Sequence, residues 1–158
     1  MGENIIKGDN IHYPTETFYS DIVAVAAIVG GAGADLQLPD VVVPAWLNGF
    51  VLRAEVIVMF NETLDTSGVA NKLNGDQYVQ VQRSVAGAYI NAMLLKDDMF
   101  PTPLSAKGAG AILIGNLDVK AQVFGPATYN IKILTGKADG SNLELHTVQT
   151  GIRVFLFR

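Results

Sequence analysis

Apolar residues of this chain lie mostly in short runs separated by turn-forming residues. The clearest run is Leu52 to Val56, where apolar residues alternate with Arg53 and Glu55. This period of two is typical of a β-strand with one face toward water. About nine or ten such segments, spaced by roughly 8–12 residues, indicate a β-sandwich or a small barrel. No segment has the pattern of a convincing amphipathic helix, so we expect an all-β, antiparallel β-sandwich of jelly-roll type.

The predicted extended segments are residues 18–29, 36–38, 41–43, 50–60, 78–83, 89–95, 111–114, 118–124, 128–134, 142–148 and 151–157. Pro39 and Pro44 end the two shortest segments, since proline cannot donate to a strand ladder. Residues 61–76 are predicted as a long polar loop with turns at both ends. Residues 1–17 lack a strand pattern and are predicted as an extended N-terminal arm, followed by one sandwich domain at residues 18–158.

Several of these segments are apolar on both faces of the strand that they would form. They are residues 22–29, 41–43, 56–60, 111–114 and 154–157. Strands of this kind normally belong to parallel sheets that helices cover on both sides. Because no such helices are expected here, the second apolar face must be covered by loops of the chain or by another copy of it.

We expect another copy to supply most of this cover, because large apolar patches on monomers are rare and mark interfaces. Removing about 800 Å² of apolar surface from water gains about 20 kcal/mol before the costs of association. The predicted partner is therefore the chain itself, in a homo-oligomer for which a trimer is one candidate. After Glu55 the outward face becomes apolar, so the subunit contact should begin near this residue. The predicted interface residues are Ile57, Met59, Phe155, Phe157, His12 and Tyr13.

The composition agrees with a surface that is poor in charge. Hydrophobic residues make up 49% of the chain and charged residues 16%, against about 25% charged residues in ordinary domains. The longest apolar run, residues 22–34, is shorter than the roughly 20 residues of a membrane span. The N-terminal residues lack the pattern of a secretion signal, and no basic stripe with interleaved aromatic residues is present. We therefore expect neither a membrane nor a nucleic acid as partner.

The charges are unevenly distributed along the sequence. Residues 1–79 contain 3 basic and 10 acidic side chains, whereas residues 80–158 contain 8 and 5. Opposite net charges could favour contact between copies of the chain. Alternatively, the two sets of charges mix on one folded surface.

No catalytic, cofactor or metal site is predicted. The chain has no cysteine, and His12 and His146 lie far apart without the spacing of zinc ligands. Residues 30–33 form a glycine-rich turn, but two prolines follow it in place of the helix that a dinucleotide site requires. Oxygen donors in residues 61–76 could bind calcium, although turn formation explains the same residues.

The strands of residues 18–60 and 109–158 are rich in glycine, alanine and valine, and an arm precedes them. In this build, and in its lack of cysteine, the chain resembles the small jelly-roll structural proteins of virus particles. Capsid decoration proteins of tailed bacteriophages are the class that it resembles most. The resemblance implies a protein of the virion without enzymatic activity. Its partner would be the lattice of the major capsid protein, and the arm would face the capsid or clasp a neighbour.

Two other functions remain open from the sequence. A β-sandwich of this size could bind a carbohydrate or another ligand through aromatic side chains that stack on it. The candidates for such stacking are Trp46, Tyr78, Tyr89 and Tyr129. A weaker alternative is an enzyme that uses carboxylates in its loops.

Overall fold

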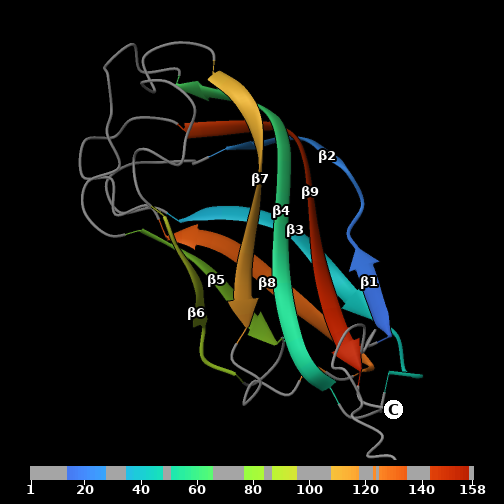
Figure 1. Cartoon of the computed structure of the whole chain (residues 1–158). Helices are drawn as coiled ribbons and strands as arrows, with labels where there is room; N and C mark the ends of the chain where they lie inside the picture. Colours follow the sequence, from blue (N-terminus) through green and yellow to red (C-terminus); the bar gives the residue numbers. More distant parts are fainter. Residues whose placement is uncertain are drawn as a thin grey trace, which may run out of the picture.

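The computed structural model describes residues 14–27, 35–47, 51–65, 77–83, 87–95, 108–117, 123, 125–134 and 143–156 (Figure 1). All regular elements within these residues are β-strands. They are β1 (Thr15–Tyr19), β2 (Val23–Ala27), β3 (Leu36–Val43), β4 (Val51–Asp65), β5 (Gln77–Arg83), β6 (Ile90–Leu95), β7 (Gly108–Leu117), β8 (Ala127–Leu134) and β9 (Leu143–Leu156). The predicted all-β class is confirmed.

The strands form two antiparallel sheets that pack against each other (Figure 1). Sheet A has the order β1-β9-β4-β7, with β2 also paired to β9, and sheet B has the order β3-β8-β5-β6. The strand pairing is nested, as in one long hairpin: β1 and β2 pair with β9, β3 with β8, β4 with β7 and β5 with β6. Successive pairs alternate between sheet A and sheet B, which is the topology of a jelly roll. The predicted antiparallel sandwich of this type is therefore confirmed.

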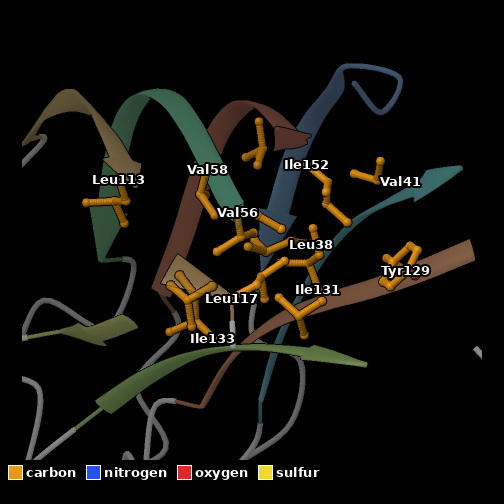
Figure 2. Packing of buried hydrophobic residues seen from close by; sticks show 14 of the residues in the cluster. Leu38, Val41, Val56, Val58, Leu113, Leu117, Tyr129, Ile131, Ile133 and Ile152 are labelled. Atoms are coloured by element: carbon orange, nitrogen blue, oxygen red, sulfur yellow. The ribbon is translucent and has the colours of Figure 1, made fainter. Parts of the chain in front are cut away.

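The inner faces of both sheets form one hydrophobic core. Alternation along β4 directs Val56 and Val58 inward, and β8 contributes Ile131 and Ile133 from the opposite sheet (Figure 2). Ile152 on β9 is fully buried in the same cluster. The two sheets also approach closely at Gly115 of β7, where an added Cβ would lie 2.7 Å from the Ala92 carbonyl oxygen of β6. Each sheet therefore depends on the other for the cover of its inner face.

The first predicted strand is divided into two by a register shift. Tyr19 is paired with Gly151 and Val23 with Val148, so four steps along the edge correspond to three steps along β9. Ser20 keeps the register, since its backbone N–H donates to the Thr150 carbonyl oxygen (2.9 Å) and its hydroxyl accepts a hydrogen bond from the Thr150 N–H (3.0 Å). The extra residue therefore lies at Asp21 or Ile22, before Val23. Such an extra residue is a β-bulge, which re-aims the side chains that follow it.

Several predicted boundaries differ from the structure. β1 begins at Thr15, so residues 15–17 of the predicted arm belong to sheet A, and residues 1–13 lie outside the described residues. β4 continues to Asp65, because its pairing with β9 extends that far. The two strands predicted at residues 142–148 and 151–157 are one strand, β9. Of the strand predicted at residues 118–124, only Val123 lies within the described part, and it is not in a strand.

Candidate interaction surface

The outer face of sheet A carries a group of apolar side chains. We call these residues the apolar patch: Tyr19, Ile22, Ile57, Met59, Ile112 and Ile114. Ile112 is 67% exposed and Ile22 is 62% exposed, although both are large aliphatic residues. Removing such side chains from water is energetically favourable, so the patch is a candidate contact surface.

Cross-strand pairing brings the residues of the patch together. Ile57 of β4 lies opposite Ile114 of β7 and opposite Gly151 of β9. Gly151 in turn lies opposite Tyr19, whose ring atom Cδ1 would be 3.0 Å from a Cβ added at this glycine. The tyrosine ring therefore covers Gly151. Ile57 is only 5% exposed yet does not belong to the core cluster, so neighbours on the outer face cover it.

A second row of the patch borders an open hollow of about 500 Å³. Met59 lies opposite Ile112 in this row, and both line the hollow together with Ile22. Gly110 lies at its floor, where an added Cβ would be 2.3 Å from the Phe60 carbonyl oxygen. Glycine thus lets β7 approach β4, and no side chain at position 110 fills the hollow.

Glu55 borders the patch at the end where β4 begins. Its carboxylate accepts hydrogen bonds from Arg153 Nε (2.8 Å) and Nη2 and from Arg53 Nη2. Arg53 also donates to Asn116 Oδ1 (3.1 Å), and both guanidinium groups lie within 5.7 Å of the centre of the Phe155 ring. The expectation that Glu55 faces water is wrong: it is 4% exposed, because these neighbours cover it.

The opposite end of the same face carries acidic groups. Glu144 Oε2 lies 3.2 Å from His146 Nε2, and both side chains are half-buried. Glu62 of β4 lies opposite His146 in the register of the sheet. The arginine end has two cations and one carboxylate, whereas this end has two carboxylates and one histidine. The patch therefore lies between a positive and a negative end.

The central row on the outer face of sheet B is polar. Lys132 of β8 lies opposite Gln37 and Gln80, and the Gln80 amide donates to Asn91 Oδ1 (2.8 Å). The ammonium group of Lys132 donates to Asp35 Oδ2 (2.5 Å) and lies 4.0 Å from the centre of the Tyr89 ring. This row makes its own hydrogen bonds and needs no apolar cover.

The structure places the predicted interface residues in different surroundings. Ile57 and Met59 belong to the apolar patch, while Phe155 lies beside the arginine cluster. The other three, Phe157, His12 and Tyr13, lie outside the described residues. Sequence reasoning named neither Ile112 nor Ile114 as an interface residue, although both lie in a segment that is apolar on both faces. It also missed Ile22, which lies in another such segment, and Tyr19, for which the sequence carries no signal.

The four aromatic residues considered for ligand stacking do not form one site. Tyr129 is 2% exposed and lies in the core, where no ligand can stack on it. Trp46 is exposed and packs against Phe18 at 5.6 Å between ring centres, near the end of β3. Tyr78 lies opposite Leu134, at the other end of β8. Tyr89 lies against Lys132, as described above.

Two searches of the described residues found no candidate, one for a metal site and one for a helix that could span a membrane. No group of three or more histidine, aspartate or glutamate side chains among them could hold a metal ion. Of the segment whose oxygen donors could bind calcium, residues 61–65 form the end of β4 and residues 66–76 lie outside the described part. No helix in the described part is long and apolar enough to cross a membrane.

No protein-family model matches the sequence, and no curated protein matches it. The function proposed below therefore depends on the fold and on the surface described above.

Proposed function

We propose that this chain is a structural protein of a virus particle, either a capsid decoration protein or a minor capsid protein, that acts as a homo-oligomer. The observation that carries the proposal is the apolar patch on the outer face of sheet A. Ile112 and Ile22 are more than half exposed in the single chain. A structural protein that assembles through its strand faces explains why such residues occupy that position.

The fold also supports this proposal. Jelly rolls occur widely in viral capsid proteins, although lectin domains and other proteins share the architecture. Fold alone therefore does not identify the function. Within sheet A, Glu55 forms ion pairs with Arg53 and Arg153.

A measurement of mass in solution tests the oligomeric part of the proposal. Light scattering at micromolar concentration should give a multiple of the 16.9 kDa chain. A monomer under these conditions would contradict a homo-oligomer held by apolar strand faces.

The virion part needs a separate experiment. Purified protein should cosediment with capsids of the virus whose genome encodes the chain, and the coding sequence should lie beside capsid or terminase genes. Removal of residues 1–13, which keeps all of β1, should abolish capsid binding if the arm faces the capsid. Unchanged binding by this truncated chain would exclude that role of the arm.

The exposure of Trp46 supports a second candidate, a sandwich that binds carbohydrate. Trp46 as a residue is 56% exposed, and an aromatic ring that is open to solvent offers an apolar face on which a sugar can stack. A glycan array should then give hits that the substitution Trp46→Ala abolishes. Tyr78→Ala, at the other end of sheet B, serves as the control and should keep the hits.

A further inference from the structure

We propose that the outer face of sheet A binds the same face of a second copy of this chain, across a two-fold axis that runs across the strands. This inference rests on the homo-oligomer proposed above and specifies the contact that holds it. Two features of the face indicate that its partner is a second copy of the chain. They are the arrangement of its apolar rows and the distribution of its charges.

The two rows of the apolar patch complement each other under this symmetry. Ile57 and Ile114 belong to one row, and Met59 and Ile112 belong to the next row along the strands. A two-fold axis that lies between the two rows, in the plane of the contact, places the first row of one copy against the second row of the other copy. Ile112 then meets Ile114 of the second copy, and Met59 faces the position of Ile57, which its own neighbours already cover. Contacts of this reciprocal kind define a two-fold interface.

The charges select the direction of the axis. Arg53 and Arg153 lie at one end of the face, and Glu144 lies at the other end of the same strand pair. An axis across the strands reverses their direction, so that the arginine end of each copy meets the acidic end of the other. An axis along the strands would bring Arg53 against Arg53 of the second copy. Juxtaposed like charges are unfavourable, whereas complementary ends fix the register.

The other outer face lacks these features. Its central row consists of Gln37, Lys132, Gln80 and Asn91. Gln80 donates to Asn91, and Lys132 donates to Asp35. Val42 is 65% exposed on that side, nearly as much as Ile112 at 67%. The valine therefore provides a matched control, since it has similar exposure and apolar character but lies on the face without a patch.

The first experiment compares Ile112→Lys with Val42→Lys by light scattering and sedimentation of the full chain over a range of concentrations. We expect the unmodified chain to be a dimer or another even-numbered assembly. Ile112→Lys should raise the Kd of self-association at least about tenfold, because the lysine places a charge in the centre of the contact. Val42→Lys should leave the Kd unchanged. Circular dichroism and thermal unfolding verify that both variants fold.

The outcomes separate this inference from the proposed function. An unmodified chain that is monomeric overturns both, and cosedimentation of that monomer with phosphatidylcholine vesicles would assign the patch to a lipid surface. An oligomer that persists in Ile112→Lys overturns the surface proposed here but leaves the homo-oligomer intact. A trimer likewise overturns the two-fold contact, since three copies cannot be related by two-fold axes alone.

The second experiment tests the axis with charge reversals. Arg53→Glu and Glu144→Lys should each weaken self-association by about tenfold, because each creates like charges across the proposed contact. The double variant Arg53→Glu/Glu144→Lys should restore the affinity, because both complementary contacts return with reversed sign. If the axis runs along the strands instead, the single reversals exchange one like-charged contact for another and leave the affinity unchanged. That result would overturn the proposed geometry.

Discussion

On the outer face of sheet B, Lys132, Gln80 and Asn91 form a row of hydrogen-bonded polar groups, whereas the central row on the outer face of sheet A contains Ile114, Ile57 and Tyr19. Both sheets contribute equally apolar inner faces to one core. The difference therefore does not arise from what the fold needs in order to bury its core. It shows that one sheet is suited to water and the other to a second apolar surface.

This comparison also separates two uses of charge. On sheet B the ion pair of Lys132 and Asp35 lies among polar neighbours. On sheet A the ion pairs of Glu55 with Arg53 and Arg153 lie directly beside exposed isoleucine side chains. The ion pairs on sheet A lie at one end of the apolar patch and mark its border, whereas the ion pair on sheet B lies within a polar row.

The largest loss of stability is expected in the core between the two sheets. Ile152→Ala, on the inner face of β9, should lower the free energy of unfolding by about 2–5 kcal/mol, because it leaves a cavity in the core. Ile114→Ala removes the same atoms from the outer face and should cost less than about 1 kcal/mol, since Ile114 is 48% exposed. Urea unfolding at a concentration that keeps the chain monomeric measures both. Equal losses of unfolding free energy would mean that Ile114 stabilises the single chain as much as a core residue does, which would contradict its place on an outer contact surface.

An intermediate effect is expected at the border of the patch. Glu55→Gln should lower the free energy of unfolding by about 1–3 kcal/mol, because the two arginines lose a charged acceptor that is buried between them. Glu16→Gln, on the exposed edge of β1, is the matched control and should change little. Thermal and urea unfolding compare the two. A neutral Glu55→Gln would show that the arginine cluster does not stabilise sheet A.

A smaller effect is expected on sheet B. Lys132→Met should cost about 1–2 kcal/mol, because Asp35 loses the partner of its partly buried carboxylate. Adding Asp35→Asn should recover part of this loss, since the unpaired charge is then removed. Urea unfolding of the single and double variants gives the coupling between the two residues. Additive losses would contradict a direct interaction.

The smallest effect is expected at Thr147, which lies on the rim of the hollow with a positive φ of 52°. A β-branched residue is disfavoured in this backbone region, whereas glycine adopts it readily. Thr147→Gly should therefore raise the free energy of unfolding by about 0.5–1 kcal/mol. Thr17→Gly, within β1, should lower it instead. A loss of stability in Thr147→Gly would mean that the threonine side chain makes a contact worth more than the backbone strain.

The class of fold could be predicted from local patterns. Alternation between residues 52 and 56 is a feature of neighbouring residues, so it indicates a strand without knowledge of its partner. The break predicted at Pro39 is wrong, because β3 continues through this proline with a register shift between Leu38 and Val41. The order of the strands could not be read in this way. Strand β9, for example, is paired with both β1 and β4, which lie far away in the sequence.

The same limit applies to the surface. The change from polar to apolar after Glu55 is visible in the sequence, and it coincides with the border of the apolar patch. The burial of Glu55 is not visible there, because its partner Arg153 is 98 residues away. The place of Tyr19 over Gly151 likewise depends on the pairing of β1 with β9. Local sequence thus predicts which side chains are apolar, while their neighbours depend on register.

The extra residue between Tyr19 and Val23 has a consequence for how such a surface can change. In a strictly alternating strand Tyr19 and Ile22 would point to opposite faces, yet here both contribute to the outer face. Deletion of one residue at this point would place Ile22 two positions after Tyr19, so regular alternation would keep both side chains on the outer face. A change in chain length at the edge can therefore remove the irregularity while the apolar surface is retained. Only a substitution of Tyr19 or Ile22 would then take apolar area away from this edge of the surface through which copies of the chain could associate.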